Sequence, residues 1–183
     1  MGTIRIGALS LSAIGLLLAG CAEPARQAAM VPEQIVAASA SNPYRNSVSS
    51  VTGYGGEETN PMMTSEISKD DFQEALELSL KQAGFFSETG NLSLRADILT
   101  VEQPLFGFDV EVAMTVRYNL FDAGGRIRFD KTIRSVYKAS FSEAFVGVER
   151  LRRANEGAAR ENISLFLKSI GGSAQGTGIK AVS

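Results

Sequence analysis

Two neighbouring segments of the chain alternate between apolar and polar residues along their whole length. The apolar positions of the first segment are Val110, Val112, Met114, Val116, Tyr118 and Leu120. Those of the second segment are Ile127, Phe129, Ile133, Tyr137, Ala139 and Phe141. A period of two residues is typical of a β-strand that is buried on one face only. Because Asp122-Ala123-Gly124-Gly125 between them has the composition of a turn, we expect one long antiparallel hairpin.

The register of this hairpin can be predicted by arithmetic. An even-numbered loop pairs residues whose numbers sum to 247, and this sum places apolar residues opposite each other. The apolar pairs are Leu120 with Ile127, Tyr118 with Phe129, and Met114 with Ile133. The same sum places opposite charges across from each other, in the pairs Arg117 with Asp130 and Asp109 with Lys138. An odd slip would turn apolar residues to water, and Lys131 is the one discordant residue on the apolar face.

Two further segments have the three- and four-residue spacing of amphipathic helices. The first helix is predicted over 69–83, because Ser68-x-x-Asp71 resembles a capping box and Gly84 is a typical helix end. Its apolar stripe consists of Phe72, Ala75, Leu76, Ser79, Leu80 and Ala83. The second helix is predicted over 147–170, before Gly171-Gly172. Its apolar side consists of Val148, Leu151, Ala154, Ala158, Ile163, Phe166, Leu167 and Ile170.

These elements predict the fold class. A strand that is wet on one side is expected at 92–98, where Leu92, Leu94, Ala96 and Ile98 alternate with polar residues, and a weaker strand is expected at 46–54. The order is then β-α-β-β-β-α. We therefore expect an α+β two-layer sandwich, with a mostly antiparallel sheet of three to four strands and both helices on one face.

The predicted domain spans residues 46–170. Residues 21–45 are rich in Ala, Ser, Gln and Pro without a sustained apolar period, so we expect a tether with at most a helical turn around 33–38. Residues 171–183 are expected to be a disordered tail.

The first twenty residues form a targeting segment. Arg5 precedes an apolar run over 6–18, which is shorter than the ~20 residues of a membrane-spanning helix. Residues 1–20 are therefore interpreted as a signal peptide, and they are left out of the fold. Without Arg5 the balance is 17 basic to 20 acidic residues, from 18 and 20 in the full chain, and this excludes the strongly basic surface of a nucleic-acid-binding protein.

Leu18-Ala19-Gly20-Cys21 resembles the lipobox of bacterial lipoproteins. The resemblance implies cleavage before Cys21, a diacylglycerol on its thiol and usually an acyl chain such as palmitate on the new terminus. Two or three acyl chains hold a protein firmly on a membrane. In such lipoproteins an Asp after the cysteine commonly signals inner-membrane retention, so Ala22 implies an outer-membrane lipoprotein facing the periplasm.

The helix that ends in Gly84-Phe85-Phe86, the strand Leu94-x-Ala96-x-Ile98 and the long hairpin also resemble small Gram-negative envelope lipoproteins. This group includes the LPS-assembly lipoprotein LptE, YajG-type lipoproteins and the auxiliary lipoproteins of ABC transport systems. The resemblance concerns the plan of residues 46–170. It carries over no functional motif and no binding residue.

The residue types restrict the available chemistry. The chain has no histidine and one cysteine, which removes His-based catalysis, His zinc sites and, if Cys21 is acylated, thiol chemistry. We therefore expect no catalytic residues, no metal and no cofactor. Asp97, Asp109 and Glu111 are the candidates for a catalytic carboxylate pair, although alternation on a wet strand face also explains them.

Several other clusters have both a functional and a structural interpretation. Gly53-Tyr54-Gly55-Gly56 is glycine-rich, but it lacks the rest of a phosphate loop and is interpreted as a turn. Arg150, Arg152 and Arg153 suit anionic lipid or a solvated helix face, where Arg152–Glu156 and Glu156–Arg160 ion pairs are expected. Asn155 and Asn162 are expected between core and water. Three aromatic clusters suit an exposed patch or the ends of the core, and these are Phe85-Phe86, Phe106-Gly107-Phe108 and Phe145-Val146-Gly147.

The favoured function is that of a non-enzymatic outer-membrane lipoprotein that binds another envelope component, a protein or a lipid, in envelope assembly or transport. One alternative is direct binding of lipid or lipopolysaccharide. A carboxylate-dependent envelope hydrolase is the other, and it requires a deep cleft with raised carboxyl pKa values. The partner and the oligomeric state do not follow from the sequence.

Overall fold

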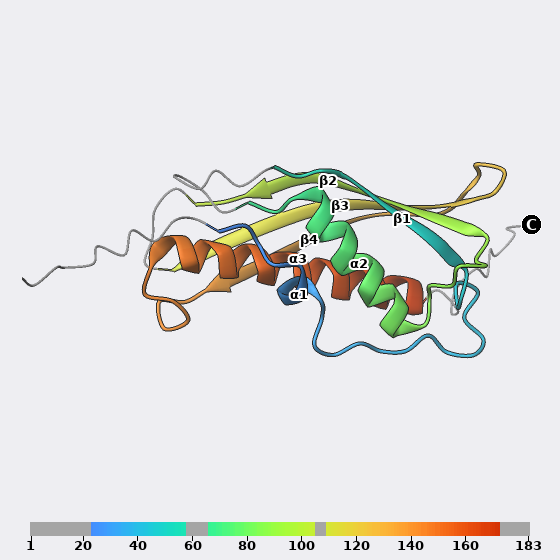
Figure 1. The fold of residues 1–183 in the computed structure, drawn as a ribbon, viewed down its shortest axis with the longest axis horizontal. Helices are drawn as coiled ribbons and strands as arrows, with labels where there is room; N and C mark the ends of the chain where they lie inside the picture. The colour runs from blue at the N-terminus through green and yellow to red at the C-terminus, as the bar shows by residue number, and fades with distance from the viewer. Residues whose placement is uncertain (1–22, 58–65, 105–108, 173–183) are drawn as a thin grey trace, which may run out of the picture.

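The computed structural model describes residues 23–57, 66–104 and 109–172. The strands form one sheet in the order β1-β2-β3-β4, and Figure 1 shows α2 and α3 on the same face of it. The predicted α+β two-layer fold is therefore confirmed. Its elements are α1 (Gln27–Met30), β1 (Val48–Gly55), α2 (Lys69–Ala83), β2 (Leu92–Glu102), β3 (Val110–Asp122), β4 (Ile127–Ala139) and α3 (Gly147–Gly171).

The sheet is mixed, because β1 is parallel to β2 while the other neighbours are antiparallel. A parallel pair needs a crossover connection, and α2 supplies it. The Asp71 N–H donates to Ser68 Oγ at the start of α2, and Gly84 ends it in the left-handed conformation. Both ends and the whole apolar stripe of this helix agree with the prediction.

The hairpin of β3 and β4 forms, but its predicted register is wrong by two residues. The Asp122 N–H donates to the Arg126 carbonyl over 3.0 Å, so the loop encloses an odd number of residues, 123–125. A second shift follows, since Phe121 pairs with Ile127 but Leu120 with Phe129, which leaves Arg128 as a bulge. The odd loop and the bulge each shift the register by one residue, so the total shift is two residues. Most of the predicted apolar face is therefore retained.

Ile127 is the one residue of the predicted apolar face before the bulge, and it does not stay on that face. It lies before the bulge and opposite Phe121, on the outer face of the sheet, and it is exposed instead of buried. The predicted ion pairs still form, because long side chains reach a diagonal neighbour. Arg117 contacts Asp130 over 2.7 Å, and Lys138 contacts Asp109 over 2.8 Å.

The described part of the expected tether, residues 23–45, packs on the domain, so the prediction of a free segment is wrong there. Ala25 and Met30 are buried, and α1 replaces the helical turn expected at 33–38. Asn42 Nδ2 donates to the Ile170 carbonyl at the end of α3 over 2.8 Å. Helix α1 packs against both α2 and α3. The few buried residues of the segment are too widely spaced to give a period.

The long helix α3 covers β3 and β4 through a core that is not purely apolar. The Tyr118 ring of β3 stacks on Phe166 with 4.1 Å between ring centroids. Burial raises the pKa of the Tyr118 hydroxyl well above its usual range, so it stays protonated and donates to Asn162 Oδ1 over 2.8 Å. Asn162 Nδ2 in turn donates to the Met114 and Ile133 carbonyls. This amide links the helix to both strands of the hairpin.

Candidate functional site at the start of the last helix

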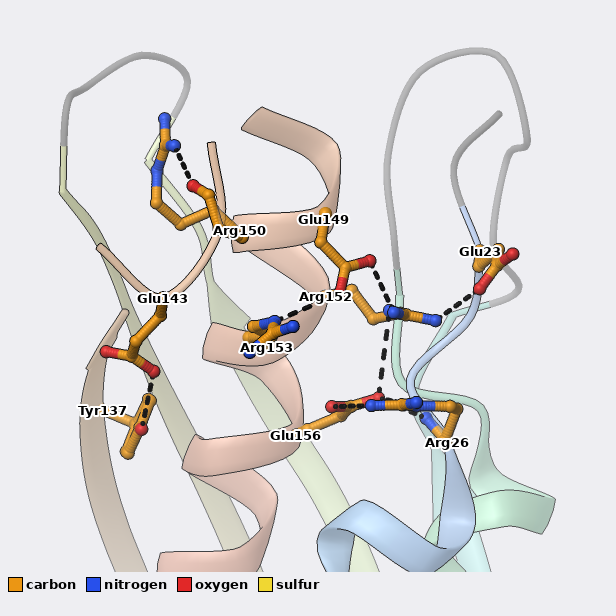
Figure 2. Close-up of polar contacts among 10 residues, drawn as sticks. Glu23, Arg26, Tyr137, Glu143, Glu149, Arg150, Arg152, Arg153 and Glu156 are labelled. Atoms are coloured by element: carbon orange, nitrogen blue, oxygen red, sulfur yellow. Dashed lines mark hydrogen bonds and ion pairs between the residues drawn. The ribbon is translucent and has the colours of Figure 1, made fainter. Parts of the chain in front are cut away.

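Charged residues gather where the first described residues meet the first turns of α3, as Figure 2 shows. Arg152 of α3 is buried and contacts the carboxylates of Glu149 and Glu23. The carboxylate of Glu156, one turn further along, accepts hydrogen bonds from the Arg26 guanidinium and from its backbone N–H, both at about 3 Å. We call these five residues the ion-pair network.

The ion-pair network attaches the start of the described chain to α3. Two of its members, Arg152 and Glu156, are almost fully buried, and a buried charge is costly unless its partners stay in place. Glu23 and Arg26 supply those partners from about 130 positions earlier in the chain. Hydrogen bonding to Glu156 raises the pKa of Arg26, which keeps the guanidinium charged. The network therefore fixes where the chain enters the domain.

A second arginine of α3 shapes the loop between β4 and α3. Arg150 is buried, and its Nη1 donates to the Ala144 carbonyl over 2.6 Å. The loop bends around this contact and exposes three apolar side chains, Phe141, Phe145 and Val146, whose exposed fractions are 44%, 77% and 55%. The Phe141 and Phe145 rings meet edge to face, with 5.2 Å between centroids. We call these three residues the apolar tip.

Glu143 stabilises the same loop from inside. Its carboxylate accepts hydrogen bonds from the Ser140 N–H over 3.0 Å and from the Tyr137 hydroxyl over 3.1 Å. The Ser140 N–H is the main cause that lowers the pKa of Glu143, so the carboxylate is ionised at neutral pH. Because Arg150 and Glu143 both hold its backbone, the apolar tip is a preformed structure.

Lowering the pH should weaken the ion-pair network. Burial alone would raise the pKa of Glu149, but hydrogen bonds from Arg152 and Arg153 bring it below its ordinary value. A carboxylate with a lowered pKa stabilises the folded state above its ordinary pKa, and this stabilisation is lost as the pH falls through the lowered value. We expect the Glu149→Gln variant to have a lower melting temperature than the wild type at pH 7. The difference in melting temperature should become steadily smaller as the pH is lowered to about 3.

Glu161→Gln is the matched control, because Glu161 lies on the exposed side of the same helix. It should melt close to the wild type across this range. A gap for Glu149→Gln that stays constant with pH would contradict the assigned role of its carboxylate.

The structure changes the interpretation of the basic cluster on α3. Arg150 and Arg152 are buried, so they form neither the solvated face nor the lipid-binding patch considered from sequence. Arg153 is exposed and contacts Glu149 over 3.1 Å. The expected pair of Arg152 with Glu156 forms, with 4.0 Å between Arg152 Nε and Glu156 Oε1, but it is buried instead of exposed. In place of the expected contact with Glu156, Arg160 donates to the Ala29 carbonyl over 3.0 Å.

The two asparagines of α3 are also more deeply placed than expected. Asn155 and Asn162 are fully buried instead of lying at the boundary with water. Asn155 Oδ1 accepts from Gln103 Nε2 over 3.3 Å, and Asn162 is the core amide described above. Their bonds are made inside the domain, so the structure gives these two side chains packing roles.

The three candidate carboxylates do not form a catalytic pair in the described structure. Asp97 of β2 contacts Arg95 over 2.7 Å. Asp109, which directly precedes β3, contacts Lys138 over 2.8 Å. Glu111 is exposed beside Lys138. The hydrogen bond from Lys138 lowers the pKa of Asp109, whereas a general acid needs a raised one. A hollow of about 660 Å³ lies beside the C-terminal half of β2, and none of these three residues lines it.

The glycine-rich segment belongs to the end of β1. A Cβ at Gly53 would lie 2.8 Å from the Lys69 carbonyl of α2, so this glycine permits close packing of the helix on the strand. Gly53 N–H donates to Gln73 Oε1 over 2.9 Å. The contacts of Gly53 are therefore structural, but the predicted turn is wrong for Gly53 to Gly55, which pair with β2 as part of the strand.

The remaining sequence-predicted positions divide between buried, exposed and undescribed residues. Phe85 is buried and Phe86 is half-buried, so this cluster closes the core. The 106–108 cluster and Cys21 lie outside the described residues. Sequence reasoning missed Glu23 and Arg26, whose partners lie far away in the chain. The alternation predicts Phe141 on the apolar face of the second hairpin strand, but Phe141 lies past the end of β4 and is exposed.

Searches of known proteins connect the fold to bacterial structures of low sequence identity. A Xanthomonas campestris protein of the family DUF330 superposes with a TM-score of 0.51 at 10% identity, over 80% of this chain and 98% of that one. A candidate lipoprotein of Caulobacter crescentus has a TM-score of 0.49 at 13% identity, over 72% and 93% of the two chains. A minor lipoprotein of Acinetobacter baumannii has a TM-score of 0.49 at 14% identity, over 70% of this chain and 92% of that one.

The first of these likenesses shows a shared fold. No protein-family model matches the chain, and no curated protein matches it. Within residues 23–57, 66–104 and 109–172, no helix is long and apolar enough to span a membrane. The same residues contain no acidic, cysteine or histidine cluster suited to a metal ion.

Proposed function

We propose that this protein is a lipoprotein of the Gram-negative envelope, acylated on Cys21. The observation that carries the proposal is the sequence Leu18-Ala19-Gly20-Cys21, which holds the chain's one cysteine directly after a short apolar run. Ala22, in place of Asp, favours the outer membrane by resemblance to sorted lipoproteins.

Metabolic labelling tests the anchor. Cells that express the full chain are given an alkyne-bearing palmitate, and the two membranes are separated on a density gradient. We expect label on the wild-type protein and nearly all of it in the outer-membrane fraction, since several acyl chains make dissociation negligible. Cys21→Ser should carry no label.

The control for this experiment is a variant far from the anchor. Ser183→Cys leaves Cys21 in place and adds a second thiol at the other end of the chain, and it should label and fractionate as the wild type. An unlabelled wild-type protein, or a Cys21→Ser protein that stays in the membrane pellet, would contradict the anchor.

We further propose that the domain acts without catalysis, as a binding or accessory component of envelope assembly or transport. The support is chemical: the chain lacks histidine, and two of its three candidate carboxylates, Asp97 and Asp109, are held in ion pairs. Crosslinking in intact cells followed by purification should recover one reproducible envelope protein or lipid. Recovery of no specific component would count against this role.

A second candidate function is direct binding of lipid or lipopolysaccharide. The apolar tip favours it, because the tip presents two aromatic rings to the surface at one end of the domain. The envelope hydrolase stays the least supported hypothesis, since Asp109 has a lowered pKa and lies on an exposed strand end.

A further inference from the structure

The start of the described chain and the apolar tip lie at the same end of the molecule. Glu23 contacts Arg152, which lies six residues after Val146 in α3, so about 9 Å of helix separates them along the axis. Figure 1 shows the β4–α3 loop and the blue start of the described chain at one end of the long axis. The tip therefore lies beside the point where the chain enters the domain.

The chain between the proposed lipid and this end is short. Two residues lead from Cys21 to Glu23, and an extended chain spans about 7 Å over that distance. From Glu23 onward the segment is held, since Arg152 contacts Glu23, the Ala25 N–H donates to the Glu66 carbonyl, and Arg26 contacts Glu156. An acylated Cys21 therefore leaves the domain no room to stand away from the bilayer.

The tip itself has the character of a membrane contact. Aromatic side chains are favoured at the boundary between lipid headgroups and acyl chains. Phe141 and Phe145 face water in the isolated domain, and Arg150 holds the backbone of Ala144 and Phe145 so that the rings remain exposed. No refolding is needed before such a loop enters a lipid surface.

We infer that the apolar tip inserts into the surface of the bilayer that carries the Cys21 lipid, so that the domain stands end-on with the start of α3 against the membrane. The inference rests on the proposed anchor. The partner of the apolar tip is a lipid surface, because the anchor brings that surface within reach of the tip.

A single tryptophan can test this orientation, since the chain contains none. Phe145→Trp places an indole on the tip. Val36→Trp is the matched control: both positions have the same exposed fraction, 77%. Val36 lies beside Ser164 and Leu167, and Ser164 is about 25 Å along α3 from Gly147, well away from the tip.

Both variants are prepared as full chains, purified after processing in cells, and placed on vesicles of phosphatidylethanolamine and phosphatidylglycerol with brominated phosphatidylcholine. We expect the Phe145→Trp emission to shift to the blue and to fall about twofold, as for a side chain 5–10 Å deep in the headgroup–acyl boundary. The Val36→Trp emission should stay unchanged. Equal quenching of both, or of neither, would overturn the end-on placement.

Acylation is measured separately, so that failure of the anchor and failure of the tip give different results. The mass of the purified protein reports the lipid on Cys21. If the thiol proves to be free, the anchor proposal is wrong, and the same protein is coupled to maleimide-lipid vesicles through Cys21. Quenching of the tryptophan at position 145 would then still support insertion of the apolar tip. The absence of quenching would reject insertion. Circular dichroism of both variants checks that each is folded.

Discussion

Gly157→Val is expected to lower the free energy of unfolding by about 3 kcal/mol, the upper range for overpacking a well-packed core. A Cβ at Gly157, in the middle of α3, would lie 2.3 Å from Cγ of Tyr137 on β4. Cγ is the base of the ring, so a flip of the ring about χ2 does not move it away. The Tyr137 hydroxyl is also bonded to Glu143. Valine therefore has to push the helix off the sheet.

Urea unfolding of the purified domain measures this effect. Gly147→Val is the matched control, because a Cβ at Gly147 at the start of the same helix meets no atom within 4 Å. Its stability should change by no more than about 0.5 kcal/mol. Combining Gly157→Val with Tyr137→Ala should return part of the loss. Equal losses in the two single variants would show that helix propensity, and not the Tyr137 contact, governs the effect.

Asn162→Ala should be of similar severity, at about 3 kcal/mol, because it leaves several buried polar groups without their partner. The Asn162 amide bonds the Tyr118 hydroxyl, two strand carbonyls and Ser135 Oγ, all inside the core. Water cannot easily replace a side chain that is fully buried. The helix and the hairpin both lose a connection.

Tyr118→Phe provides the comparison for Asn162→Ala. It removes one of the four partners and keeps the stacked ring, so we expect a loss of about 1 kcal/mol in the same urea measurement. Should Asn162→Ala cost no more than Tyr118→Phe, the bonds of Asn162 to the strand carbonyls would have no measurable weight.

Local patterns predicted most of the fold, because short-range periodicity determines which face of an element is buried. Helix α2 illustrates this, with its predicted ends and apolar stripe confirmed. The hairpin register failed for a local reason. The turn 122–125 contains two glycines, and either an even or an odd loop suits that composition. The bulge at Arg128 leaves no signature in the alternation, since only Ile127 changes face.

The candidate site was much less predictable, because its contacts join distant parts of the chain. Arg152 and Glu156 have a spacing of four, and that spacing suggests an exposed pair. Their burial depends on Glu23 and Arg26, about 130 positions earlier, and a period cannot reveal such partners. The aromatic clusters were recognised in sequence, but only the structure separates buried Phe85 from exposed Phe145.

The attachment of residues 23–45 to α3 has a consequence for how the chain becomes folded. Arg26 contacts Glu156, and Asn42 donates to the Ile170 carbonyl, so these residues of the first-synthesised segment have partners in the last-synthesised helix. Native contacts of such wide sequence separation form slowly. A nascent chain would thus stay incompletely folded until its final helix emerged, and the proposed lipoprotein anchor would require such a form for export.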